Sequence, residues 1–82
     1  MADKHDRVNH PPYYYSPDGR YETLDIIEAW RLPYHLSNVI KYIFRAPRKE
    51  NELLDLKKAK FYLDRYIELK EKEIDNEQNQ TT

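Results

Sequence analysis

Apolar positions recur with a helical period in three stretches of this chain, separated by prolines and polar residues. In the first stretch, Thr23 precedes an apolar run with acids in its opening turns, which predicts a helix N-capped by Thr23 and stopped by Pro33. A second helix is predicted from about His35 to Arg45, because apolar residues fall at relative positions 0, 3, 4, 7 and 8. They are Leu36, Val39, Ile40, Ile43 and Phe44.

The third stretch is the longest, and it predicts a helix from about Glu52 to Ile74 with Asn51 as its N-cap, since no proline or glycine interrupts it. At 1.5 Å per residue this helix is about 34 Å long and the second about 16 Å, so its far end is expected to extend past the shorter helices. One side carries Leu53, Leu56, Ala59, Leu63, Tyr66, Ile67 and Ile74.

Leu54 and Phe61 form a second apolar stripe on the predicted third helix, about 150° from Leu56 and Leu63 at 100° per residue. The core of a single chain cannot reach this stripe, so it points to a partner helix, most simply a second copy of the chain. The alternative is a pair of ordinary exposed apolar residues.

The two ends of the chain lack any period. About residues 1–22 hold prolines and three consecutive tyrosines, which predict an extended aromatic arm that ends in a turn at 16–19. Residues 76–82 are polar and predict a disordered tail. The predicted fold is therefore all-α: one domain over about 1–75, built as a three-helix unit (short, short, long) with an aromatic N-terminal arm and assembled as a homo-oligomer.

Composition narrows the function further. The absence of cysteine excludes disulfides and thiolate metal sites, and one glycine excludes the common phosphate-binding loops. No apolar run is long enough for a membrane span or signal peptide, so we expect a soluble cytoplasmic protein without a membrane partner. The net charge of −1 gives no general attraction for nucleic acid, which is not an expected partner.

Positive charge is nevertheless concentrated in the middle of the chain. Residues 31–49 contain five basic residues and no acid. On the predicted second helix, polar residues at relative positions 0, 3, 4 and 7 share one face opposite the apolar stripe: Asn38, Lys41, Tyr42 and Arg45. Lysine, arginine, tyrosine and asparagine are suited to hold a phosphate and an attached ring or sugar, although a solvated helix face has the same pattern.

The predicted third helix offers a matching flank with Asp55, Lys58, Tyr62 and Arg65. If the second and third helices pack antiparallel through their apolar stripes, the two flanks face each other across a groove. Asp55 would then orient Lys58 or Arg45, or hold a magnesium ion; the alternative is a weak surface pair with Lys58. His10, in a segment without periodicity, is suited to proton transfer or simply to capping a turn. Three widely spaced histidines without cysteine predict no metal site.

Several of these segments, in this order, resemble a family of small bacteriophage proteins. The family is catalogued as a domain of unknown function and includes a phage nucleotide kinase that acts on deoxynucleoside monophosphates. Where the family tends to have a second histidine after its Asn-His-Pro motif, this chain has Tyr13 and Tyr14. The matching segments are 8–11, 24–30, 38–46, 48–49 and 55–65.

The resemblance implies a nucleotide-binding, kinase-like protein of the host cytoplasm, with His10 and Asp55 as catalytic candidates and magnesium as a cofactor only if it is a kinase. The alternatives are sequestration of a nucleotide or nucleotide-derived host defence signal, and an adaptor that binds host machinery through Leu54 and Phe61. The implied nucleotide-binding residues are Asn9, Asn38, Lys41, Tyr42, Arg45, Lys49, Lys58 and Tyr62.

Overall fold

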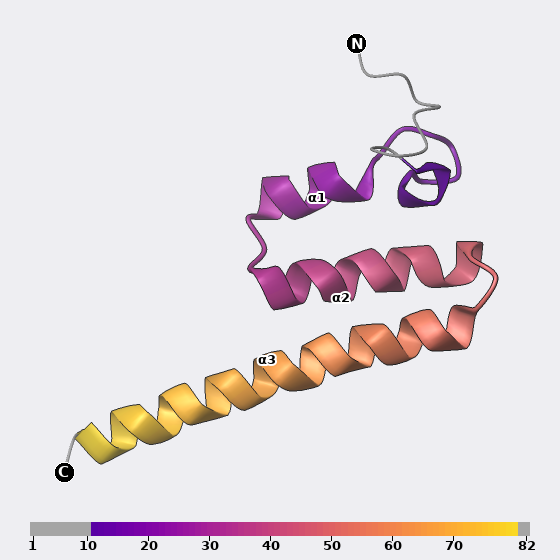
Figure 1. The fold of residues 1–82 in the computed structure, drawn as a ribbon. Helices are drawn as coiled ribbons and strands as arrows, with labels where there is room; N and C mark the ends of the chain where they lie inside the picture. The colour runs from indigo at the N-terminus through magenta and orange to yellow at the C-terminus, as the bar shows by residue number, and fades with distance from the viewer. Residues whose placement is uncertain (1–10, 81–82) are drawn as a thin grey trace.

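The computed structural model describes residues 11–80, which form three α-helices and two short 3-10 turns, with no strand in that range (Figure 1). The predicted all-α class, with helices that are short, short and long, is confirmed. No helix within these residues combines the length and the apolar content that crossing a membrane requires. The elements are η1 Pro12–Tyr14, α1 Thr23–Trp30, α2 Tyr34–Arg45, η2 Ala46–Arg48 and α3 Glu52–Gln80.

The start of α1 differs from the prediction, because Thr23 does not cap the helix. Thr23 is its first residue, and its hydroxyl instead donates a hydrogen bond to the carbonyl oxygen of Tyr14 at 2.9 Å. The helix ends at Trp30, and Arg31 adopts a left-handed conformation with φ 52°, a common way to terminate a helix. The threonine therefore fastens the N-terminal arm to α1.

The arm itself is tightly turned. The predicted turn at 16–19 is confirmed: the Gly19 N–H donates to the Ser16 carbonyl at 2.8 Å, and Gly19 has φ 73°, which suits a residue without Cβ. The η1 turn was not predicted; the Tyr14 N–H closes it on the carbonyl of Pro11 at 3.0 Å. These two turns fold the arm back toward the C-terminal end of α2.

Local signals also explain α3. Asn51 caps it as predicted, because its side-chain oxygen accepts the Leu54 N–H at 3.0 Å. The helix continues to Gln80, six residues beyond the predicted end at Ile74, so residues 76–80 extend the helix instead of belonging to a tail. Glutamate and glutamine favour helix, and no proline or glycine stops it. With 29 residues against 12 in α2, α3 extends well past its neighbours (Figure 1).

The second helix lies between the other two and runs antiparallel to α3 (Figure 1). Its apolar stripe faces α1: Leu36 and Val39 of α2 line one hollow together with Ile26 of α1. The opposite, polar face of α2 meets α3. Packing of α2 and α3 through both apolar stripes, the condition set above for facing flanks, is therefore not what the structure has. Tyr42 stacks on Tyr62, His35 lies on Tyr66, and Arg45 pairs with Asp55 across this joint.

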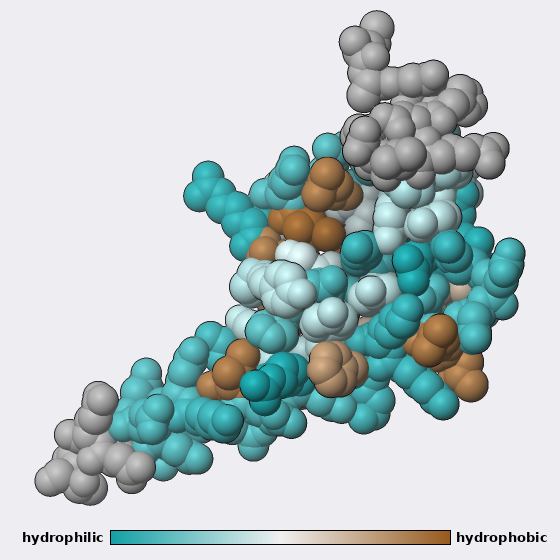
Figure 2. Space-filling model, viewed as in Figure 1, coloured by the Kyte–Doolittle hydropathy of each residue, from teal (hydrophilic) through white to brown (hydrophobic). Residues whose placement is uncertain are grey.

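Apart from Ala59 and Tyr66, the large residues on the apolar side of α3 stay exposed. Ala46 and Ala59 are the buried apolar residues within the part of the chain that is described. Figure 2 shows brown apolar patches on the visible surface over α1 and along α3, surrounded by hydrophilic side chains. Five half-exposed residues of α3 form a surface that we call the Leu53–Ile74 stripe. They are Leu53, Leu56, Leu63, Ile67 and Ile74, which are 62%, 41%, 40%, 46% and 53% exposed.

Candidate functional site

Three segments converge where the arm meets the facing sides of α2 and α3. η1 contributes two tyrosines, α2 a lysine, a tyrosine and an arginine, and α3 an aspartate and a lysine, while Lys49 comes from the short connection between α2 and α3. We call this group the cation–tyrosine cluster. Its members are Tyr13, Tyr14, Lys41, Tyr42, Arg45, Lys49, Asp55 and Lys58.

Arg45 lies at the centre of the cluster. Its Nη2 and Nε donate to the two carboxylate oxygens of Asp55 at 2.7 and 3.2 Å, and its Nη1 donates to the hydroxyl of Tyr14 at 3.3 Å. The guanidinium also lies over the ring of Tyr42, 4.9 Å from its centroid. This two-pronged geometry fixes the arginine plane and joins all three segments.

The same contacts shift both pKa values. Hydrogen bonding from Arg45 lowers the pKa of Asp55, and hydrogen bonding to Asp55 raises the pKa of Arg45. Asp55 is only 3% exposed. It is thus a buried carboxylate whose oxygens are both occupied, and its geometry is that of a residue that positions Arg45.

Three lysines surround this pair. The Lys41 ammonium lies 5.5 Å from the ring centroid of Tyr14, that of Lys49 lies 4.4 Å from Tyr13, and that of Lys58 lies 5.5 Å from Tyr42. Within residues 11–80 no ion pair engages any of these three ammonium groups. The tyrosine faces stabilise the cations, and their N–H donors stay available to an anion.

Tyr62 lies deeper, inside the joint between α2 and α3. Its ring stacks on Tyr42 with centroids 5.9 Å apart and planes 10° apart, and its edge meets Tyr34. Hydrogen bonding with Tyr34 raises the pKa of Tyr62. The next turn repeats the pattern, with His35 packed on Tyr66. Tyr62 therefore supports the face that carries the cluster.

The structure thus brings seven of the ten expected site residues to one place. Asn38 lies one turn earlier on α2, where its side-chain amide donates to the Tyr34 carbonyl at 3.0 Å. Arg65, predicted on the same flank of α3, instead pairs with Glu68 in solvent. Asn9 and His10 lie outside the described residues. The seven are Lys41, Tyr42, Arg45, Lys49, Asp55, Lys58 and Tyr62.

Comparison with known families now places the chain. A model of a protein family of unknown function, DUF3310, matches residues 8–64. The chain belongs to the DUF3310 family. No curated protein and no solved structure matches it. The DUF3310 match covers the arm from residue 8, then α1, α2 and α3 as far as Asp64, and so contains every member of the cation–tyrosine cluster.

Sequence reasoning missed the arm's contribution to the cation–tyrosine cluster. Tyr13 and Tyr14 were expected only as part of an aromatic arm, yet their rings contact the ammonium groups of Lys49 and Lys41, and the Tyr14 hydroxyl accepts a hydrogen bond from Arg45. Two features of the sequence could have indicated this contribution: the run of tyrosines after two prolines, and the basic residues between 31 and 49 without an acid in the same stretch. Cation–π pairing is the chemistry that connects these two features.

The described residues of the DUF3310 chain do not fit a protein-bound magnesium ion. Asp55 is the carboxylate within the cluster, and Arg45 occupies both of its oxygens. Residues 11–80 contain no group of three or more histidines and acids close enough to share a metal. Magnesium prefers several oxygen ligands, and the phosphates of a nucleotide would have to supply them.

Proposed function

We propose that this DUF3310 protein binds a phosphorylated nucleotide, with its phosphates held by Lys41, Lys49 and Lys58 around the fixed guanidinium of Arg45. The observation that carries this proposal is the convergence of four cations on three tyrosine rings, with all three ammonium groups outside any ion pair of the described residues. Lys41 and Lys58 are half-buried, so the cluster differs from an ordinary solvated helix face. Like charges gathered this closely repel, and a bound anion offsets that repulsion.

Lys41→Ala should lower nucleotide affinity by about tenfold to a hundredfold, the usual contribution of a charge-assisted contact to phosphate. Isothermal titration calorimetry with nucleoside mono- and triphosphates measures the effect, and circular dichroism should show unchanged helicity. Lys57→Ala is the matched control, because Lys57 is an exposed lysine of α3 next to Lys58 and outside the cluster. Equal affinities of Lys41→Ala and wild type would place the anion elsewhere.

Two activities are compatible with such a site. The family resemblance supports a phage nucleotide kinase that acts in the host cytoplasm on deoxynucleoside monophosphates. The pairing of Asp55 with Arg45 favours the alternative, in which a nucleotide or a nucleotide-derived signal is held without turnover, because hydrogen bonds from Arg45 to both oxygens lower the pKa of this carboxylate and make it a weak base. His10 is then the remaining candidate for proton transfer in a kinase, with magnesium carried by the donor triphosphate.

Incubation with a deoxynucleoside monophosphate, a triphosphate donor and magnesium distinguishes the two activities. A kinase should yield diphosphates, and His10→Ala should lower kcat much more than affinity. A sequestering protein should release the nucleotide unmodified, with His10→Ala changing the dissociation constant alone. Chromatography of the released nucleotides after overnight incubation gives the answer, and unmodified ligand across all common monophosphates rules out the kinase.

The proposal includes a homo-oligomer, with the copies packed through the Leu53–Ile74 stripe in place of the Leu54 and Phe61 stripe from which the sequence predicted a second copy. These residues are spaced by three, seven, four and seven positions, close to the 3.5-residue repeat by which two helices pack along their length. Among the described residues, two alanines are the buried apolar residues. A small domain with so little buried apolar surface gains stability by burying more of it against a partner. A second copy of the chain is present wherever the protein is made, whereas a host protein need not be, so a second copy is the simpler partner for this surface. The Leu54 and Phe61 stripe, 46% and 63% exposed, leaves room for an adaptor function as the competing use of α3.

A further inference from the structure

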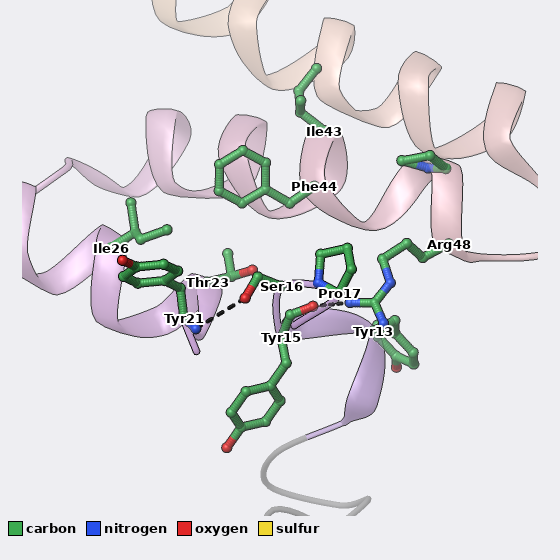
Figure 3. Close-up of a pocket in the computed structure, with 11 residues that line it drawn as sticks. Tyr13, Tyr15, Ser16, Pro17, Tyr21, Thr23, Ile26, Ile43, Phe44 and Arg48 are labelled. Atoms are coloured by element: carbon green, nitrogen blue, oxygen red, sulfur yellow. Dashed lines mark hydrogen bonds between the residues drawn. The ribbon is translucent and has the colours of Figure 1, made fainter. Parts of the chain in front are cut away.

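A hollow of about 540 Å³ lies beside the cation–tyrosine cluster, and its volume is within the range of small-molecule sites (Figure 3). The arm and the start of α1 form one side, and the last turn of α2 with η2 forms the other. Figure 3 shows Phe44 of α2 facing Pro17 and Thr23 across this space, with Tyr21 and Ile26 at one end and Arg48 at the other.

The walls of the hollow suit a flat ring. They are aromatic or aliphatic except for Ser16, Thr23 and Arg48, and each of these polar groups already has a protein partner. The Ser16 hydroxyl donates to Asp18, the Thr23 hydroxyl donates to Tyr14, and Arg48 donates to the carbonyl of Tyr15. The site therefore offers mainly stacking and apolar contact, with the guanidinium of Arg48 as the charged group in its wall.

The hollow and the cluster share a wall. Tyr13 lines the hollow, while the ammonium of Lys49 lies 4.4 Å and the guanidinium carbon of Arg45 lies 5.7 Å from the centroid of the same ring. Arg48, at the end of the hollow, is the neighbour of Lys49 in the chain. The apolar hollow, which suits a ring, and the cluster of cations, which suits phosphates, thus meet at Tyr13. A nucleotide joins a flat base to phosphates and would bridge the two.

We propose that this hollow holds the base of the bound nucleotide, stacked against Phe44 and Tyr21, while the phosphates reach the lysines across Tyr13. The inference rests on the proposed function, because it assigns the remaining part of the same ligand. Base stacking on an aromatic side chain tolerates any base, so the hollow contributes affinity for nucleotides over free polyphosphate more than it selects among bases.

Calorimetry with two probes tests this assignment: a panel of nucleoside monophosphates, and inorganic tripolyphosphate, which has no base. Phe44→Ala and Tyr21→Ala should each lower nucleotide affinity by about tenfold or more and leave tripolyphosphate affinity within about twofold. Trp30→Ala removes an exposed aromatic of α1 that does not line this hollow and should leave the nucleotide affinity unchanged.

The outcomes separate the two proposals. If wild type binds nucleotides and both alanine variants bind them equally well, the base lies elsewhere, and the phosphate site stands. If the variants lose nucleotide and tripolyphosphate equally, the hollow shapes the cluster and holds no base. If they lower the oligomer mass with nucleotide affinity unchanged, the hollow is an interface between copies. Failure of wild type to bind either probe overturns the proposed function itself. Tyr21 is 55% exposed, so Tyr21→Ala remains informative if Phe44→Ala does not fold.

Discussion

Asp55→Ala should destabilise the folded protein by about 3 kcal/mol, because it leaves the guanidinium of Arg45 without its partner in a largely buried position. The two side chains are only 16% and 4% exposed, and their closest N–O distance is 2.7 Å. They join α2 to α3, and Arg45 also bonds Tyr14 of the arm. Urea unfolding at one fixed protein concentration measures the loss, since oligomer stability depends on concentration.

An exposed pair provides the matched control. Lys60 and Asp64 have the same 2.7 Å separation, but their side chains are 74% and 51% exposed. Lys60→Ala should therefore leave the free energy of unfolding almost unchanged. If Asp55→Ala costs no more than Lys60→Ala, the Arg45–Asp55 pair does not hold the helices together.

A double variant, Arg45→Met with Asp55→Leu, separates stability from binding. Replacing a buried ion pair by apolar residues of similar volume is often neutral, so most of the stability should return. Nucleotide affinity should stay low, because the guanidinium is gone. Full recovery of affinity in this variant would mean that Arg45 serves the fold alone.

Acid should weaken the same pair. Hydrogen bonding from Arg45 holds the pKa of Asp55 below its usual value of 3.8. A lowered pKa in the folded state adds stability above the unfolded value, and this stability is lost as the pH falls below about 3.8 toward the folded pKa. The difference in unfolding free energy between wild type and Asp55→Asn should therefore shrink below pH 3.8. A difference that stays constant down to pH 2.5 would contradict the assignment.

Leu63→Glu should dissociate the oligomer, because it places a charge in the middle of the Leu53–Ile74 stripe where a second copy is proposed to pack. Leu63 is 40% exposed in the single chain, so the glutamate can reach solvent once the copies separate. Light scattering coupled to size exclusion should show at least a dimer for wild type at tens of micromolar, and a smaller mass for the variant.

Phe61→Glu distinguishes the two apolar stripes of α3. Phe61 is 63% exposed and belongs to the other stripe, with Leu54. If copies meet through the Leu53–Ile74 stripe, this variant should keep most of the wild-type mass. Dissociation by Phe61→Glu but not by Leu63→Glu would move the interface to the Leu54 side. A monomeric wild type would refute the oligomer altogether.

Much of the local structure could be predicted from the sequence. The three helices follow from apolar periodicity, the start of α3 from Asn51, and the turn at 16–19 from a proline and a glycine. Such signals act between residues a few positions apart, so they do not depend on the rest of the fold. Prediction was wrong where local preference meets a distant partner: the hydroxyl of Thr23 bonds the arm and leaves α1 uncapped.

Helical periodicity alone assigns residues to one face of α2 and to one flank of α3, because a helical period places side chains without reference to neighbours. Which of these faces meet follows from packing between the helices. Packing through the apolar stripes was one arrangement that the pattern left open for α2 and α3, but between these helices Tyr42 stacks on Tyr62 and Arg45 pairs with Asp55. Stacked aromatic rings and a bidentate ion pair can pack two helices together as aliphatic side chains do. The arm then places Tyr13 against Arg45 and Tyr14 against Lys41. Which of two helix faces packs against a neighbour depends on contacts between residues far apart in the chain. The spacing of residues within one helix carries no information about such contacts.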